Sequence, residues 1–158
     1  METAKFQEEM WKEFYTLKRA MGNLLGPAAR AEGLTEWQAF LLNGIREGVA
    51  DNISSLCENM GVSQGNASSL CKKLEQGGFL LRERSREDER VVRLRLTAQG
   101  EEALRRIQSR TSMVDVVLKQ TSPEELDLIL EGMRTLSRMF RRIEAMQIEQ
   151  EGSRSTNA

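Results

Sequence analysis

Residues 84–100, RSREDERVVRLRLTAQG, contain the pattern that decides the fold of this chain. The segment begins with mixed charge, changes to strict alternation of apolar and charged residues, and ends with Thr-x-x-Gly. Alternation with a period of two predicts a strand over residues 91–96, and residues 79–84 predict a partner strand. The polar residues 85–90 lie between the two strands. We therefore expect a β-hairpin with a charged tip.

Two short helices are predicted immediately before this hairpin. Asp51 or Asn52 can cap the first helix, and Ser63 can cap the second. A corner at Gly61 joins the helices, and the double glycine at residues 77–78 ends the second one. Two short helices joined by a tight turn that contains glycine are typical of a helix-turn-helix.

Longer helices are predicted on both sides of this segment. Apolar residues recur at steps of three and four over residues 2–30, where Pro27 can bend or end the helix. Further helices are predicted over residues 35–48, 97–119 and 122–146. The first and last helices carry apolar stripes that are too long for one small lobe to bury, which predicts pairing with a second copy of the chain.

The order helix-turn-helix, hairpin, helix describes a winged helix-turn-helix, so we expect a mainly α-helical fold with a small β-hairpin wing. In such a domain the second short helix enters the DNA major groove and the wing reaches the minor groove. We expect one domain over residues 1–146, with the winged lobe at 35–97 and helical dimerisation regions at 2–31 and 98–146. Residues 147–158 are expected to form a disordered tail.

Positive charge is concentrated in the predicted lobe. Residues 64–97 contain eight Lys and Arg and five acidic residues, a balance of +3 in a chain whose formal net charge is −1. Arg93 and Arg95 lie on the face of their strand opposite the apolar residues. This placement suits contact with a polyanion, although charge alternation is also typical of the solvated face of a strand.

Composition argues against several other classes of protein. The 158 residues include no histidine and two cysteines, so the chain lacks the commonest general base and the ligands of a structural zinc site. No apolar run approaches the roughly 20 residues that span a bilayer. We therefore expect a cytoplasmic protein that has no cofactor, no metal and no membrane partner, and that is not an enzyme.

The hairpin also resembles a known family. Asp88-x-Arg90 followed by VVRLRLTAQG is similar to the wing signature of the MarR family of bacterial transcription regulators. The preceding VSQGNASSLCKKLEQGGFLLRERS is similar to that family's recognition helix and first wing strand, and the resemblance covers residues 6–146. It implies a homodimer that represses transcription by binding double-stranded DNA at a pseudo-palindrome. In that family a small phenolic or lipophilic effector, or thiol oxidation, often relieves repression.

The resemblance also implies roles for individual residues. Arg90 would enter the minor groove, and Asp88 would orient it by a charge-assisted hydrogen bond. The wing would further contact DNA through Arg84 and Arg86. The recognition helix would do so through Ser63, Gln64, Asn66, Ser68, Ser69, Lys72 and Lys73.

This recognition helix departs from the expected pattern in one respect. It begins Gln64-Gly65-Asn66 and has no Lys or Arg before Lys72, so bidentate reading of guanine by arginine is not expected from it. The amides of Gln64 and Asn66 suit adenine edges, and an arginine in the wing favours a narrow A·T-rich minor groove. The sequence therefore predicts A·T-rich half-sites.

Two alternatives stay open at this point. Cys57 and Cys71 lie on apolar faces of the predicted short helices, where free cysteine suits core packing. Lys72 and Lys73 adjoin Cys71, however, and nearby cations can activate a thiol, which leaves a redox-sensing regulator of the same family as a hypothesis. The second alternative is a winged-helix module that binds a protein partner with its wing.

Overall fold

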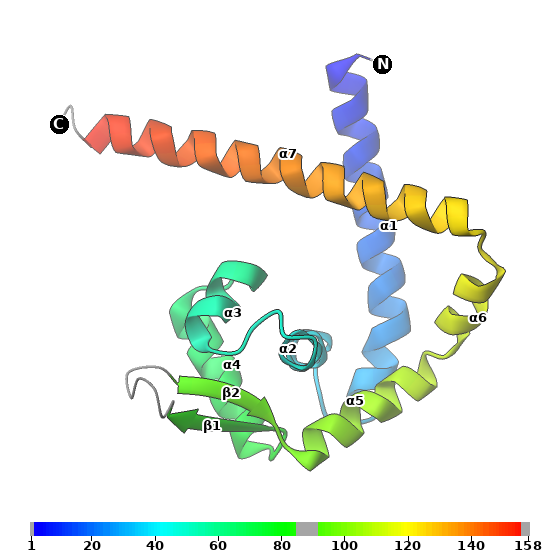
Figure 1. The fold of residues 1–158 in the computed structure, drawn as a ribbon, viewed down its shortest axis with the longest axis vertical. Coiled ribbons are helices and arrows are strands. Elements are labelled where there is room, and N and C mark those ends of the chain that lie inside the picture. Colours follow the sequence, from blue (N-terminus) through cyan, green and yellow to red (C-terminus); the bar gives the residue numbers. More distant parts are fainter. Residues whose placement is uncertain (1, 85–91, 156–158) are drawn as a thin grey trace. The chain divides into compact units, whose positions relative to one another are not determined.

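The computed structural model describes residues 2–84 and 92–155 (Figure 1). The chain divides into two compact units, Met1–Ser112 and Met113–Ala158, so the division falls inside the range that was expected to form one domain. The first unit contains α1 to α5 and the two-stranded sheet, and the second contains α6 and α7. The expected fold class is confirmed.

The first unit begins with α1 (Thr3–Arg30) and α2 (Glu36–Arg46). α1 continues past Pro27 to its end at Arg30, so the proline does not end the helix. α2 begins with a capping box. The Thr35 hydroxyl accepts the Gln38 N–H at 3.2 Å, and the Gln38 side chain accepts the Thr35 N–H at 2.8 Å.

The predicted helix-turn-helix is present as α3 (Ile53–Met60) and α4 (Gln64–Gln76). Gly61 follows α3 with a φ of 63°, in the left-handed region where a side chain is strained. This conformation ends α3 abruptly and lets α4 begin within a few residues. The two helices therefore pack against each other at the angle that places α4 beside the hairpin (Figure 1).

Side-chain caps determine where these two helices begin. Asn52, not Asp51, is the cap of α3, because its side-chain oxygen accepts the Ser55 N–H at 2.9 Å. The Ser63 hydroxyl caps α4 by accepting the Asn66 N–H at 3.4 Å. Each cap satisfies a backbone donor that the first turn of a helix leaves without a partner.

The hairpin consists of β1 (Leu80–Arg84) and β2 (Val92–Leu96), which pair antiparallel. β1 begins one residue later than predicted, and residue 91, the predicted start of the second strand, lies outside the described residues. The link before α3 joins the same sheet, because the Leu94 N–H donates to the Asp51 carbonyl at 2.7 Å. The base of the wing is thus attached directly to the start of the helix-turn-helix.

The Thr-x-x-Gly motif forms the junction between the wing and α5 (Ala98–Arg110). The Thr97 hydroxyl accepts the Gly100 N–H at 3.0 Å and donates to the Gly78 carbonyl at 2.5 Å. The Thr97 N–H also donates to the Phe79 carbonyl at 3.1 Å. The motif therefore caps α5 and binds its first turn to the start of β1.

One apolar core holds the first unit together. It draws on every element from α1 to α5, as the periodic apolar positions predicted. The six largest of its side chains that are less than 2% exposed are Leu41, Leu42, Leu56, Cys71, Leu74 and Leu80. Because all six come from α2, α3, α4 and β1, the core fixes the helix-turn-helix and the wing as one body.

The helix predicted over residues 97–119 is divided in the structure. α5 ends at Arg110, and α6 (Met113–Gln120) follows a break at Thr111. The Thr111 hydroxyl donates back to the Ile107 carbonyl at 3.0 Å. Such local side-chain bonds compete with the helical ladder, which periodicity of apolar residues cannot detect.

The last helix, α7 (Pro123–Ser155), begins as predicted with proline at its first position. The Ser122 hydroxyl accepts the Glu125 N–H at 3.2 Å. α7 continues beyond residue 146 into the segment expected as a tail, because residues 147–151 include neither proline nor glycine. No helix in the described part of the chain is both long and apolar enough to cross a membrane.

Gly100→Ala should destabilise the protein by about 1–3 kcal/mol, because overpacking against backbone cannot be relieved by moving a side chain. A Cβ at Gly100 would overlap the carbonyl oxygen of Phe79 and lie 3.1 Å from its carbonyl carbon. The free energy of unfolding in urea measures the loss. Gly65→Ala is the matched control, since a Cβ there meets nothing within 4 Å. It should instead gain about 0.5–1 kcal/mol of stability, and equal stability of both variants would contradict the packing argument.

Candidate nucleic-acid interface

The residues predicted for the recognition helix lie on the surface of α4. Its opposite face is buried, with Ala67, Cys71 and Leu74 all at 0% exposure. The polar face is accessible over the whole helix, since only Ser68 among the predicted contacts is partly buried. The predicted contacts on this face are Ser63, Gln64, Asn66, Ser68, Ser69, Lys72 and Lys73. Their contact with DNA stays a prediction.

The two faces of the hairpin differ in their charge. Directly opposed residues of an antiparallel pair point to the same face, and Arg82 is opposed to the buried Leu94. Arg82 and Arg84 therefore share the inner face of the hairpin, the face that includes core residues. Arg93 and Arg95 lie on the outer face.

Acidic residues balance the outer face of the hairpin. The guanidinium of Arg93 is 3.6 Å from the Asp51 carboxylate, and that of Arg95 is 3.5 Å from the Glu83 carboxylate. Exposed pairs like these contribute only about 0–1 kcal/mol to stability. They nevertheless reduce the positive charge of the outer face. The two arginines of the inner face have no such carboxylate partner within the described residues.

Arg82 is a candidate contact that the sequence analysis did not assign. It is half-buried on β1, and its positive charge lowers the pKa of Cys71 against the larger, raising effect of burial. β1, the strand that carries Arg82, packs against α4. The sequence did contain a signal for this position of Arg82. Alternate residues of a strand share a face, so counting in steps of two from Leu80 places Arg82 on the side of the strand that faces the core.

The predicted contacts of the wing are only partly visible. Arg84 ends β1 and is exposed. Arg86, Asp88 and Arg90 lie outside the described residues, so the expected minor-groove contact of Arg90 and its orientation by Asp88 stay predictions.

The two cysteines lie in the core region between α3 and α4. Cys71 is buried and Cys57 is partly buried. Burial raises the pKa of the Cys71 thiol, which lowers its thiolate fraction at neutral pH and favours the core-packing interpretation. Neither thiol belongs to a group of three or more metal-ligating side chains within the part of the chain that the structure describes.

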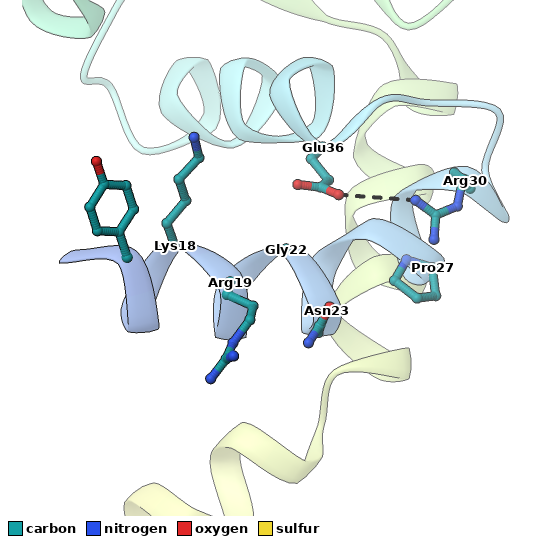
Figure 2. Close-up of a pocket in the computed structure, with 8 residues that line it drawn as sticks. Lys18, Arg19, Gly22, Asn23, Pro27, Arg30 and Glu36 are labelled. Atoms are coloured by element: carbon teal, nitrogen blue, oxygen red, sulfur yellow. Dashed lines mark ion pairs between the residues drawn. The ribbon is translucent and has the colours of Figure 1, made fainter. Parts of the chain in front are cut away.

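A groove of about 650 Å³ lies between α1 and the start of α2 (Figure 2). Arg30 and Glu36 face each other at one end, 4.0 Å apart. Lys18 points from α1 toward α2, whereas Arg19 points to the opposite side of α1. Lys18 has no carboxylate partner among the described residues, so its ammonium group is available to an anionic ligand. The groove is lined by Tyr15, Lys18, Arg19, Gly22, Asn23, Pro27, Arg30 and Glu36.

A helix-turn-helix with a hairpin wing, an accessible polar face on α4 and adjacent cations defines the winged helix-turn-helix class of transcription regulators. Residues 23–107 match the family described as transcriptional regulator SarA/Rot. Because the match covers more than half of the chain, this chain belongs to the SarA/Rot family of transcriptional regulators.

A relative and several solved structures agree with this assignment. The chain is 34% identical over 87 residues to YfiV of Bacillus subtilis strain 168, an uncharacterized HTH-type transcriptional regulator, and it spans about half the length of that relative, 54% of each chain. MarR of Staphylococcus aureus, in complex with salicylate and kanamycin, has a TM-score of 0.72 at 18% identity, with 87% of this chain and 94% of that chain covered. A cysteine-to-serine mutant of Escherichia coli MarR, complexed with operator DNA, has a TM-score of 0.68 at 15% identity, with 86% and 99% covered. At these identities the structures show a shared fold, so the resemblance to MarR regulators is confirmed at the level of the fold.

Alkylation should distinguish the two thiols. In the folded protein at neutral pH, Cys57 should react with iodoacetamide and Cys71 should stay protected, because Cys71 is buried and its pKa is raised. Intact-mass spectrometry of the Cys57→Ser and Cys71→Ser variants measures each thiol alone, and both should react fully in denaturant. Rapid labelling of native Cys71 would restore the redox-sensing hypothesis.

Proposed function

We propose that this regulator binds double-stranded DNA, with α4 in the major groove and the wing reaching the minor groove. The main support is the position of cations that have no carboxylate partner within the described residues. Arg82 and Arg84 lie on the inner face of the hairpin, and Lys72 and Lys73 lie on the exposed surface of α4. Contacts between such residues and phosphates supply most of the non-specific affinity for DNA and bring the base-reading residues into register. The operator complex of the related E. coli MarR fold supports the same use of this architecture.

We propose that the half-sites are rich in A·T pairs. Gln64 and Asn66 are exposed near the start of α4, where a recognition helix reads base edges. Their amides suit the N6 and N7 groups of adenine. Lys72 and Lys73, the only cations on α4, lie in its second half, which suits phosphates rather than bases.

We propose that two copies form a homodimer through the terminal helices. Each unit exposes large apolar side chains, which monomeric proteins rarely do over extended surfaces. In the first unit α1 exposes Phe6, Trp11, Tyr15, Leu17, Met21 and Leu24. In the second unit α7 exposes Leu128, Ile129, Leu130, Met133, Met139, Phe140, Ile143, Met146 and Ile148. A symmetric dimer would bury these surfaces and present two winged units to a pseudo-palindrome, where binding represses transcription by occupying a promoter.

We propose the groove between α1 and α2 as the place where a small phenolic or lipophilic effector binds. Tyr15 supplies an aromatic side chain, and Lys18 supplies a cation for a phenolate or carboxylate group (Figure 2). The S. aureus MarR structure, which has salicylate bound, supports ligands of this kind for the fold. An effector bound in this groove would contact the first unit on the side where α1 lies.

DNA binding should depend on Arg82 and not on Arg95. Arg82→Ala removes a cation that has no carboxylate partner in the described part of the chain, so affinity for a selected operator should fall about tenfold at 150 mM salt. The slope of log affinity against log salt should also decrease by about 0.9, the value for one phosphate. Arg95→Ala is the matched control on the same hairpin, because Arg95 is already paired with Glu83, and its affinity should stay within about twofold of the wild type. Fluorescence anisotropy with labelled duplexes measures both quantities.

The operator can be identified by selecting fragmented genomic DNA with the purified protein, and the Arg90→Ala variant is tested in parallel. We expect enrichment of a short inverted repeat with A·T-rich half-sites, weakened in the variant. Half-sites rich in G·C would contradict the proposed base preference. Absence of any enrichment by a folded wild-type dimer, at low as well as moderate salt, would favour a protein-docking role for the wing.

If the protein is a homodimer, its mass in solution should be about twice the chain mass of 18.0 kDa. Light scattering coupled to size exclusion at micromolar concentration measures this mass. Met133→Glu adds a charge to the apolar face of α7 and should shift the mass toward the monomer, because a buried unpaired charge is costly. Glu144→Gln, on the same helix, should leave the mass unchanged. A wild-type monomer would contradict the proposal and, with it, the pseudo-palindrome.

A further inference from the structure

Glu32 forms a charged cluster at the turn between α1 and α2. Its side chain is only 7% exposed. One carboxylate oxygen accepts a hydrogen bond from Arg106 at 3.2 Å, and the other accepts one from Arg110. Arg106 in turn donates to Glu102 at 2.9 Å. One largely covered carboxylate therefore binds two arginines, one helical turn apart, on the same face of α5.

This cluster lies at the end of α5 that is opposite the wing. At its first turn, α5 is bound to the turn between α4 and the wing by Thr97 and by the Gln99 side chain, which donates to the Gly77 carbonyl at 3.0 Å. At its last turn, Arg110 is bound to Glu32, and the helix breaks at the next residue, Thr111. α5 is thus fixed at both ends, and the second fixed point is where the chain leaves the first unit.

Apolar packing and charged hydrogen bonds act together at this second point. Ala28 and Ala29 of α1 and Ala103 and Ile107 of α5 belong to the same buried core. Close packing of apolar side chains restricts how two helices lie against each other, but the attraction itself is not directional. Hydrogen bonds between a carboxylate and two guanidinium groups are directional, because both groups are planar and their donors are fixed. Glu32 therefore selects one register of α5 on the α1–α2 turn.

We propose that Glu32 is a positioning residue that, through Arg106 and Arg110, fixes where α6 and α7 leave the DNA-binding unit. This inference rests on the proposed dimer. In that dimer, the point where α6 and α7 leave sets the distance between the two DNA-binding units. That distance in turn sets the separation of half-sites that the protein prefers. Glu32 contacts no DNA in this mechanism. It acts on the fit between the dimer and the operator.

The test compares full-length wild-type protein with Glu32→Gln on two kinds of labelled duplex. One kind has two half-sites separated by the selected spacing or by one to three base pairs more or fewer, and the other has a single half-site. For Glu32→Gln we expect about tenfold weaker binding at the best spacing, a flatter dependence on spacing, and single half-site affinity within about twofold of the wild type. Glu32→Asp keeps the charge and should recover part of the preference. Glu101→Gln, an exposed glutamate of the same helix, is the matched control and should behave as the wild type.

The outcomes separate this proposal from the proposed function. Wild-type protein that binds no DNA contradicts DNA binding itself. Wild-type protein with a sharp spacing optimum that Glu32→Gln retains overturns the positioning role. Equal losses on single and double half-sites also overturn it, because they indicate a general loss of structure. Should Glu32→Gln fail to fold, Arg110→Gln removes the other half of the same contact and must flatten the spacing profile.

A pH series adds a readout specific to the charge. The hydrogen bond from Arg110 and the charges of Arg106 and Arg110 lower the pKa of Glu32 in the folded protein, despite its desolvation. A lowered folded-state pKa means that the carboxylate stabilises the fold above its ordinary pKa and stops doing so as the pH falls through the lowered value. The melting temperature of wild type should therefore exceed that of Glu32→Gln near neutral pH, and the difference should vanish in acid. A difference that does not change with pH would mean that shape, not charge, is what Glu32 contributes.

Discussion

The backbone contact between Gly100 and the carbonyl group of Phe79 is the constraint on which the DNA-binding unit depends. It allows the first turn of α5 to lie directly on the start of β1, where Thr97 bonds both segments. With the wing held at this junction, the register of the hairpin places Leu80 and Leu94 in the core. The same register decides which arginines share the inner face with these core residues and which lie on the outer face. The Thr-x-x-Gly motif is therefore a structural element that joins the wing to α5.

Charge in the hairpin follows from this register. The outer arginines, Arg93 and Arg95, each meet an acid, whereas Arg82 and Arg84 do not meet one within the described residues. A count of basic residues treats all of these arginines alike. Their separation into a balanced face and an unbalanced face supports the proposed use of the inner face toward a polyanion. It also explains how a chain with a net charge of −1 can offer a cationic surface.

Much of this architecture was predictable from local rules. Ser63, Thr97 and Ser122 were expected to cap helices and do so, because capping needs only a hydroxyl and a backbone donor three residues later. The turn at Gly61 was predictable for the same reason, since its left-handed conformation is a local requirement. The break at Thr111 was not, because a hydroxyl that bonds back to a carbonyl is permitted inside a helix as well as at its end. On the candidate interface, the residues predicted on α4 lie on its accessible face, whereas Arg82 became a candidate contact only from the register of the hairpin.

The sequence by itself determined the elements, their order and the family signature, because caps, glycine turns and apolar periods act within a few residues along the chain. Only the tertiary structure decided which charges are paired. Glu32 meets Arg106 and Arg110 across more than seventy residues of sequence, and Arg93 of β2 meets Asp51 in the link between α2 and α3. No local pattern specifies such partners. They depend on how the core packs α1, α5 and the hairpin together, and packing of that kind is a property of the whole unit rather than of any segment.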